Sequence, residues 1–428
     1  MTNPLASWWQ NLNENYQRLI LSILFSITVI ILGYIIYYIF FKPIPNAPGT
    51  RRVVAPPTTE LPSSGKRPSG SAGTEGEGAE NQTLPVAGSV PIAPPDEIAS
   101  GNKTYAVPVI YSGTKGAALD SSGKLNYYNE LDGKFYAVDS LGNSETRSLE
   151  TFPNASNITF SPNGNNAVIE FPDNTKIMYD FKNSRQYTLP SEAQDIQFSR
   201  ASDQLAYEFI TDNPDNNWLI VAKTTGESAS AVEHIGTANI DDILVNWSPD
   251  NTKIAFFRKS GGLNSEEVFL VGQNQENFKS LKVNGRGFEG TWSPNGDKLV
   301  YTVYHPDSGY RPELWVTQSG DENIGTGNKN LGIRTWTSKC AFGDNKSLYC
   351  AVPLYLEEGT GIYPALSEEV PDMIYKINPD TGFKQQIAIP TNSLGLGFYT
   401  VQKLMVPPDG SILYMTDSNG GVYEIRLK

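Results

Sequence analysis

The chain is poor in the residues from which metal sites and disulfide scaffolds are built. It contains two Cys and two His, and the latter, His234 and His305, lie far apart in the sequence. Two Cys exclude a disulfide-rich scaffold and a four-thiolate zinc site, and two distant His disfavour a polyhistidine metal centre. We therefore expect neither a metal nor a cofactor.

Cations are scarce as well. The 428 residues include 33 Lys and Arg against 46 Asp and Glu, which gives a formal net charge of −13. The whole excess of acids lies after residue 103. Because binding of a phosphate backbone needs clustered cations, an acidic C-terminal part argues against a nucleic-acid partner.

Motifs of the common catalytic classes are missing. The sequence has no G-x-S-x-G, H-E-x-x-H, Walker A or G-x-G-x-x-G pattern. Turns rich in Asp and Asn occur at 212–217, 378–382 and 417–421, but none has the full spacing of an EF-hand loop, and such residues are typical of hairpin turns. We expect a protein that is not an enzyme.

One long apolar run is present near the N-terminus. Residues 19–41 form 23 positions without a charge, which is enough for a helix to cross the roughly 30 Å of a bilayer core. Residues 1–18 place Leu5, Trp8, Leu12 and Tyr16 on one stripe, which predicts a short amphipathic segment at the lipid surface. The sequence therefore predicts a single-pass membrane anchor.

A tether follows the anchor. Residues 42–103 are rich in Pro, Gly and Ser and show no apolar periodicity, so we expect a disordered linker ahead of a folded part at 104–428. Two observations disagree about the side of the membrane on which the folded part lies. Lys42, Arg51 and Arg52 outnumber Arg18, which by the positive-inside rule places the C-terminal part in the cytoplasm. The Pro-rich spacer, the acidic surface and the scarce Cys favour an extracytoplasmic location, which we prefer.

A short signature recurs along the rest of the chain. An aromatic or aliphatic anchor precedes Ser-Pro-Asn/Asp-Gly or a variant, and an alternating strand follows. The seven anchors, separated by 41, 38, 49, 45, 50 and 64 residues, are Leu119, Phe160, Phe198, Trp247, Trp292, Phe342 and Val406. Each unit is long enough for a four-stranded meander, and such sheets must stack around an axis to bury both faces. The repeat predicts an all-β fold, a β-propeller of seven four-stranded blades, with six as the alternative.

These copies resemble the repeat of the TolB-type, WD-repeat-like propeller family, which reads approximately W-S-P-D-G-x-x-I-A-F. The resemblance covers residues 115–428 and is most specific at Trp247 and Trp292, each followed by Ser-Pro. It implies a binding platform and a location in the cell envelope. It does not imply a reaction, because the fold hosts both enzymes and scaffolds.

Two further features concern closure of the ring. The last blade has only three strands of its own, and the unassigned segment 104–111, TYAVPVIY, precedes the first anchor. We expect this segment to supply the fourth, outer strand of the last blade, with Pro108 at the edge.

Cys340 and Cys350 flank the turn of the Phe342 unit and should lie nearly opposite each other. A disulfide and two buried free thiols are equally compatible with this spacing.

Loop lengths indicate where a partner would bind. The turns between the first and second strands are uniformly short, whereas long loops occur at 304–312, 353–371, 318–335 and 390–399, which belong to the opposite face of the ring. Interface-forming residue types gather in two of them, and our candidate partner-binding residues are Tyr304, His305, Tyr310, Arg311, Tyr355 and Tyr363.

Two function classes follow from these observations. The first is a membrane-anchored platform that binds a protein or a cell-wall polymer. The second is an envelope enzyme that acts on a glycan through acidic residues of the propeller funnel, which would need two facing carboxylates.

Overall fold

The computed structural model describes residues 25, 27–28, 31–32, 93–236, 242–262 and 264–428. The expected amphipathic segment 1–18 and residues 42–92 of the linker lie outside these ranges, as does most of the span 19–41. Of that span, Phe25, Ile27, Thr28, Ile31 and Leu32 are described, and all five are helical. Within the described ranges, no helix has the length and apolar character needed to cross a membrane.

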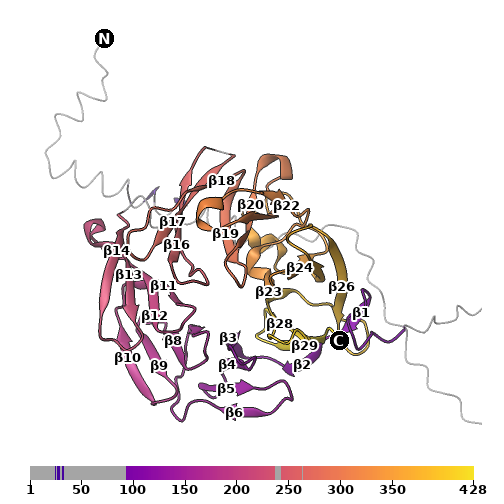
Figure 1. Cartoon of the computed structure of the whole chain (residues 1–428). Helices are drawn as coiled ribbons and strands as arrows, with labels where there is room; N and C mark the ends of the chain where they lie inside the picture. Colours follow the sequence, from indigo (N-terminus) through magenta and orange to yellow (C-terminus); the bar gives the residue numbers. More distant parts are fainter. Residues whose placement is uncertain (1–24, 26, 29–30, 33–92, 237–241, 263) are drawn as a thin grey trace, which may run out of the picture. The chain divides into compact units, whose positions relative to one another are not determined.

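Seven sheets form the folded part, and Figure 1 shows them arranged around a common axis. The predicted seven-bladed, four-stranded propeller is therefore confirmed, and six blades are excluded. The first four blades are β3 (Thr114–Leu119), β4 (Leu125–Asn129), β5 (Lys134–Val138), β6 (Ser144–Thr146); β7 (Asn157–Phe160), β8 (Asn166–Glu170), β9 (Lys176–Asp180), β10 (Arg185–Leu189); β11 (Ala193–Phe198), β12 (Gln204–Phe209), β13 (Trp218–Lys223), β14 (Ala229–His234); and β15 (Ile243–Val245), β16 (Lys253–Ser260), β17 (Glu266–Gly272), β18 (Leu281–Val283).

The remaining three blades carry the longest loops. Their strands are β19 (Arg286–Trp292), β20 (Lys298–Tyr304), β21 (Glu313–Gln318), β22 (Lys329–Asn330); β23 (Cys340–Asp344), β24 (Ser347–Pro353), β25 (Asp372–Ile377), β26 (Lys384–Thr391); and β27 (Val401–Met405), β28 (Ile412–Asp417), β29 (Val422–Arg426). Short 3-10 helices lie in the loops at η1 (Pro214–Asn216), η3 (Pro306–Ser308), η4 (Asp321–Asn323), η5 (Thr337–Lys339) and η6 (Pro364–Ser367).

The recurring Ser of the signature builds the turn between the first two strands. In blades two to five the hydroxyl oxygens of Ser161, Ser199, Ser248 and Ser293 each accept the backbone N–H five residues on, at 2.9, 3.1, 2.9 and 3.0 Å. The residue four after the anchor has positive φ, 69° at Gly164 and 60° at Asn251, which explains the preference for Gly or Asn there. The repeat is thus a turn motif repeated around the axis.

The core lies between neighbouring sheets. Phe256 of blade four stacks on Trp292 of blade five with ring centroids 5.4 Å apart. The last blade meets the first in the same way, since Met405, Tyr414 and Val422 pack in one cluster with Leu125 and other residues of the first blade. Each blade therefore depends on both neighbours for its burial.

An N-terminal strand closes the ring, as expected. β2 (Val107–Ile110) pairs antiparallel with β29 and becomes the outer strand of the last blade, with Pro108 on that edge strand. The expectation is wrong for Thr104 and Tyr105, which belong to β1 (Lys103–Tyr105). This strand pairs parallel with β26 and extends the sixth blade to five strands. The segment crosses from one blade to the next because both sheets offer an open edge.

Residues 93–103, assigned to the linker from composition, are also attached to the propeller. The N–H of Ala99 donates to the Arg426 carbonyl at 2.8 Å, and the N–H of Gly101 donates to the Ile387 carbonyl at 2.7 Å. The ammonium of Lys103 donates to the Gly395 carbonyl at 2.8 Å. The chain thus reaches the ring along the outer edges of blades six and seven.

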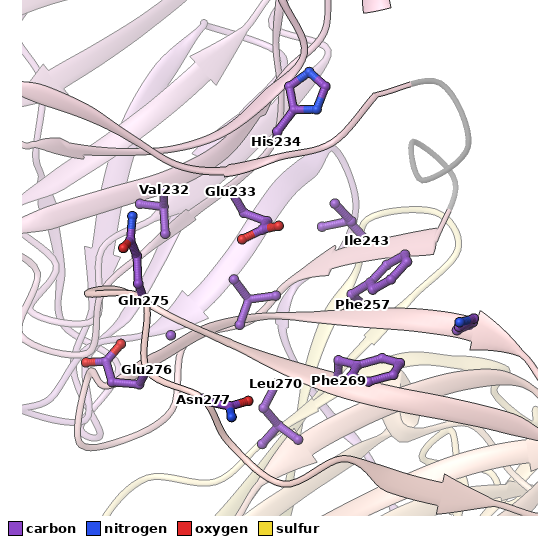
Figure 2. A pocket seen from close by; sticks show the side chains of 13 residues that line it. Val232, Glu233, His234, Ile243, Phe257, Phe269, Leu270, Gln275, Glu276 and Asn277 are labelled. Atoms are coloured by element: carbon purple, nitrogen blue, oxygen red, sulfur yellow. The ribbon is translucent and has the colours of Figure 1, made fainter. Parts of the chain in front are cut away.

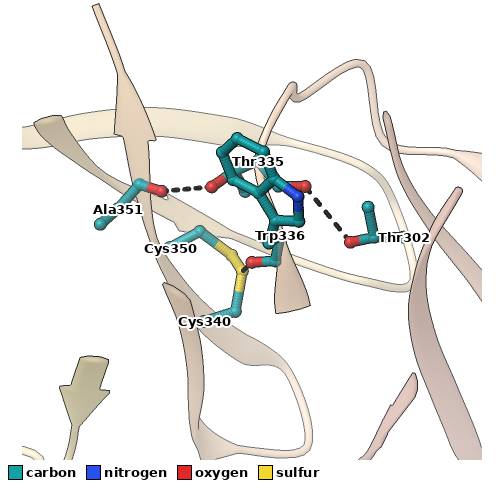
Figure 3. The surroundings of a disulfide bond; sticks show 6 residues. All are labelled: Thr302, Thr335, Trp336, Cys340, Cys350 and Ala351. Atoms are coloured by element: carbon teal, nitrogen blue, oxygen red, sulfur yellow. Dashed lines mark hydrogen bonds between the residues drawn. A yellow bond between two sulfur atoms is a disulfide. The ribbon is translucent and has the colours of Figure 1, made fainter. Parts of the chain in front are cut away.

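Cys340 and Cys350 face each other in the register of β23 and β24 and are joined by a disulfide. Figure 3 shows the bond beside a chain of hydrogen bonds through Thr335. The Thr335 hydroxyl donates to the Ala351 carbonyl at 2.6 Å, and the Thr302 hydroxyl donates to the Thr335 carbonyl at 3.2 Å. The connection into blade six is therefore fixed to strands on both sides.

Candidate functional site

Strand direction sorts the loops onto two faces of the ring. From β3 to β29 the strands of each blade pair antiparallel in sequence order, so the loop between strands two and three and the connection to the next blade emerge on one face. We call this the long-loop face, and we call the opposite one the short-turn face. The loops 304–312 and 353–371 and the connection 391–400 all belong to the long-loop face, over blades five to seven. We call these three segments the loop crown. The expectation for 318–335 is wrong for residues 319–328, which join strands three and four of blade five and so emerge on the opposite face.

Backbone hydrogen bonds join the first two segments of the loop crown. The N–H of Gly359 donates to the Gly309 carbonyl at 2.9 Å, and the N–H of Gly361 donates to the Tyr310 carbonyl at 2.7 Å. A Cβ at Gly361 would lie 2.6 Å from the Cβ of Tyr304, so the two loops approach as closely as glycine allows. The loop of blade six is therefore held against that of blade five.

A buried ion pair attaches the third segment. The Asp372 carboxylate accepts the N–H of Val401 at 2.7 Å and pairs with the Lys339 ammonium at 3.0 Å, with the Asp372 side chain fully buried. The N–H of Asp372 donates to the Tyr399 carbonyl at 2.9 Å. Burial raises the pKa of Asp372, against the opposing effect of the Lys339 charge. These contacts make the crown one connected structure across three blades.

The six candidate partner-binding residues divide into two groups. Tyr304, His305 and Arg311 are engaged within the protein. The Tyr304 ring lies against Gly287 and Gly361. The His305 Nε2 lies 3.2 Å from a Glu313 carboxylate oxygen. Arg311 donates hydrogen bonds to one carbonyl of each loop, those of Ser308 and Leu356. Tyr310, Tyr355 and Tyr363 are exposed. The structure thus brings the six together, with three building the loops and three facing solvent.

The crown carries most of the exposed large apolar side chains described in residues 93–236, 242–262 and 264–428. Nine of the fifteen are here, from 40% exposed at Tyr310 to 67% at Leu394. Six of the nine were missed from the sequence: Leu354, Ile362, Leu366, Leu394, Leu396 and Phe398. These residue types are typical of a hydrophobic core, so the length of their loops was the only sequence feature that could have identified them as exposed. On the short-turn face, Leu141 and Phe383 are the exposed large apolar residues within the described chain.

The crown is also acidic. Its exposed acids include Glu357, Glu358, Glu368 and Glu369, and its one Arg, Arg311, lies 3.8 Å from Glu358. Exposed apolar side chains together with acidic ones are suited to binding a protein surface of opposite charge.

Two carboxyl groups on the inner strands have raised pKa values. Burial raises the pKa of Asp195 on β11 and of Glu289 on β19. Asp195 accepts the Val245 N–H at 2.7 Å, which links blade three to blade four. Blade four separates the two acids in the ring order. Asp195 therefore has a structural contact that accounts for its position.

The turns rich in Asp and Asn use side-chain oxygens of these residues to accept hydrogen bonds from their own backbone. Asp417 accepts the N–H groups of Asn419 and Gly421 at 3.0 and 2.7 Å, and Asn378 accepts those of Asp380 and Thr381 at 2.9 and 3.1 Å. In the described ranges, no group of three or more His, Cys, Asp and Glu could hold a metal ion.

A separate cavity of about 550 Å³ lies on the flank of the ring, between blades three and four. Figure 2 shows apolar side chains including Ile243, Phe257 and Phe269 along it, with Glu233 and His234 on the blade-three side. The His234 ring packs on Trp218 with centroids 4.9 Å apart, and its Nε2 lies 3.2 Å from the Asp215 carbonyl. His234 is a packing residue of blade three, and the cavity is distinct from the loop crown.

Comparison with known proteins identifies neither a family nor a function for the chain. No family model and no curated protein matches the chain. Among solved structures, it is similar to an oligogalacturonate lyase in complex with manganese (11% identity, TM-score 0.45, covering 74% of this chain and 90% of that one). It is also similar to the tricorn protease (9% identity, TM-score 0.48, covering 75% of this chain and 34% of that one). A third similar structure is the hydrazine synthase of Kuenenia stuttgartiensis (13% identity, TM-score 0.46, covering 75% of this chain and 97% of that one). At these identities and scores no function transfers. The folded part of the chain is a seven-bladed β-propeller.

Proposed function

We propose that this protein is a non-catalytic binding platform of the TolB-like kind, anchored in the membrane by residues 19–41, whose loop crown docks a partner protein in the cell envelope. The observation that carries the proposal is the concentration of nine exposed large apolar side chains in the crown. Contiguous apolar surface on a folded domain marks an interaction site.

A protein fits this surface better than a polysaccharide does. Leu, Ile and Phe contribute through desolvation, which a protein surface with apolar side chains provides and a hydroxyl-rich polymer does not. The exposed acids Glu357, Glu358, Glu368 and Glu369 favour a partner that carries Lys and Arg beside its apolar side chains. We expect binding to weaken with salt, since the rim contribution is screened.

Crosslinking in intact cells tests the docking surface. A photoreactive amino acid at position 363 should yield one major protein adduct, whereas the same group at position 383 on the short-turn face should not. The adduct should be lost in the triple variant Tyr355→Ser, Leu394→Ser, Leu396→Ser and retained in the matched control Leu141→Ser. These side chains are all more than half exposed, so neither variant should unfold the ring.

Three outcomes would contradict the proposal: equal adducts from both faces, an adduct that survives the triple variant, or an adduct that a glycan hydrolase removes. The last would identify a polymer instead of a protein. Location is tested separately by protease added outside spheroplasts, which should cleave residues 42–92 if the propeller is extracytoplasmic. Protection from this protease would place the propeller in the cytoplasm, as the positive-inside count does.

A further inference from the structure

The last residues before the first blade cross the outer edges of blades six and seven, and we call residues 93–106 the strap. In Figure 1 its strand β1 lies beside β26 on the outside of the ring. The Gln386 side-chain amide donates to the Gly101 carbonyl at 2.8 Å. Thr104 and Ala106 are fully buried. The strap is therefore a structured part of the propeller.

Three of the exposed apolar side chains of the loop crown lie at the tip of its third segment, which we define as residues 392–398. They are Leu394, Leu396 and Phe398. Inside the tip, the Asn392 side-chain oxygen accepts the N–H groups of Leu394 and Leu396 at 3.1 and 3.2 Å. These bonds shape the tip without attaching it to the ring.

The ring holds this segment at its two ends. Thr391 is the last residue of β26, and the Thr400 hydroxyl donates to the Val370 carbonyl at 3.1 Å. Between these ends, a single hydrogen bond from elsewhere in the described residues reaches the tip. It runs from the Lys103 ammonium of the strap to the Gly395 carbonyl, at 2.8 Å.

The strap also contacts the apolar part of the tip. The Lys103 ammonium lies 5.5 Å from the centroid of the Phe398 ring, which is a cation–π distance. Lys103 is half-buried, so both of its contacts are partly shielded from water. The start of the strap lies here too, since a Cβ at Gly395 would be 3.7 Å from the Pro95 Cδ and 3.8 Å from the Ala93 carbonyl oxygen. The strap thus supports the tip from outside its own segment.

We propose that the strap positions the tip of the loop crown, with Lys103 as the positioning residue, and that detachment of the strap lowers docking at the crown. The link between strap and tip follows from their contacts, whereas its effect on docking rests on the proposed function. A hydrogen bond from an ammonium is stronger than one between neutral groups, so its loss should free the tip to open. Because coupling between two sites is reciprocal, a partner that fixes the tip should also stabilise the strap.

Amide hydrogen exchange of the full-length protein tests the link between strap and tip. The reporters are the N–H groups of Leu394 and Leu396, which exchange when the tip opens. Lys103→Met keeps the stem of the side chain and removes both contacts of the ammonium, so we expect these amides to exchange at least threefold faster. Lys103→Arg keeps a cation with N–H donors and should restore the original rate.

A matched control makes the same change on another outer strand. Lys282 is exposed on β18 of blade four, and its ammonium forms no hydrogen bond or ion pair with the described residues. Lys282→Met should leave the exchange of the tip unchanged. The N–H groups of Gly359 and Gly361, which join the other two segments of the crown, should keep their rates in every variant.

A second variant loosens the strap at a distance from the tip. Gln386→Leu keeps the side-chain volume and removes the donor to the Gly101 carbonyl. We expect the strap amides of Ala99 and Gly101 and the two reporters of the tip to exchange at least threefold faster together. Unchanged exchange of the tip in Lys103→Met or in Gln386→Leu would overturn the positioning role. An equal rise at Gly359 and Gly361 would overturn it as well, because it would indicate general loosening of the crown.

Crosslinking from position 363 tests the effect on docking. The yield of the protein adduct should fall at least threefold in Lys103→Met and in Gln386→Leu, and should stay unchanged in Lys282→Met. An equal yield in Lys103→Met would overturn the control of docking by the strap. Absence of any adduct from the unsubstituted protein would contradict the proposed function instead, and the exchange measurements, which need no partner, would still decide the positioning role.

Discussion

The guanidinium Nε of Arg311 donates a 2.9 Å hydrogen bond to the carbonyl oxygen of Leu356, so a side chain of the fifth blade holds a loop of the sixth. The same guanidinium donates to the Ser308 carbonyl at 3.2 Å. Arg is enriched in protein interfaces, but this one uses two of its donors on backbone carbonyls of the crown. Its influence on a partner would pass through the shape of the loop it supports.

Replacing Arg311 should therefore loosen the crown. Arg311→Met keeps the side-chain volume and removes both carbonyl contacts, so we expect a loss of about 1–2 kcal/mol in the free energy of unfolding. Cleavage of the loop 353–371 in limited proteolysis should become faster, whereas turns on the short-turn face should be cut at the original rate. An unchanged cleavage pattern would show that other contacts suffice to hold the loop.

Gly361 sets how closely the two loops approach. Gly361→Ala would place a Cβ 2.6 Å from the Tyr304 Cβ and 2.7 Å from the Tyr310 carbonyl oxygen. We expect a loss of about 1–3 kcal/mol in chemical denaturation, because backbone atoms must move. Gly320 is a matched control, since a Cβ there meets nothing within 4 Å and its φ of −64° suits any residue. Equal stability of the two variants would contradict the close packing.

The disulfide should be present in the protein isolated without reductant. Unfolded, unreduced protein should show no reactive thiol, and two reactive thiols per chain would contradict the bond. Because the bridge closes a short loop, with a sequence separation of 10, reduction should lower the free energy of unfolding by about 2–3 kcal/mol. The unfolding midpoint with and without dithiothreitol measures this.

Acid should weaken the turn of blade five. Hydrogen bonds from Ser293, Asn295 and Lys298 to the Asp297 carboxylate outweigh its partial burial, which acts in the opposite direction, and lower its pKa. The folded protein then binds this proton more weakly than the unfolded chain does. The stabilisation is present above the unfolded pKa of about 3.9 and is lost as pH falls through the lower folded value.

Asp297→Asn should accordingly cost less than about 1 kcal/mol at pH 7, since the carboxylate is partly exposed and screened. The difference in unfolding free energy between Asp297→Asn and the original protein should shrink toward zero by about pH 2. Urea denaturation at several pH values measures it. If this difference in unfolding free energy did not change with pH, the charge of the Asp297 carboxylate would not contribute to the stability of the turn.

The propeller could be predicted because its turn chemistry is local and repeated. The Ser293 hydroxyl binds a backbone N–H five residues on, and Gly296 supplies the positive φ, so both requirements appear within one short stretch of sequence. The position of Cys340 opposite Cys350 was predictable for the same reason, since one hairpin fixes it, whereas the bond between them was not.

Features that depend on distant contacts were not predictable. Lys103–Tyr105 joins the sixth blade because β26 has an open edge, which the strand's own residues do not indicate. Leu394 and Phe398 are residue types typical of a hydrophobic core, and only the position of their loop shows that they face solvent. Arg311 looked like a contact residue because nothing in its neighbourhood in the sequence reveals the Leu356 carbonyl.

Ring closure by β2 determines when the propeller can be completed during synthesis of the chain. The ribosome makes Val107–Ile110 before every blade strand except β1, and its partner β29 is the last strand in chain order. At roughly 5–20 residues per second, β2 waits for about 15–60 s without that partner. During this interval the nascent chain presents an unpaired edge at each end, and a product that stops before Val422 cannot complete the seventh blade. Closure therefore distinguishes finished chains from truncated ones, which would leave both edges open to proteases and chaperones.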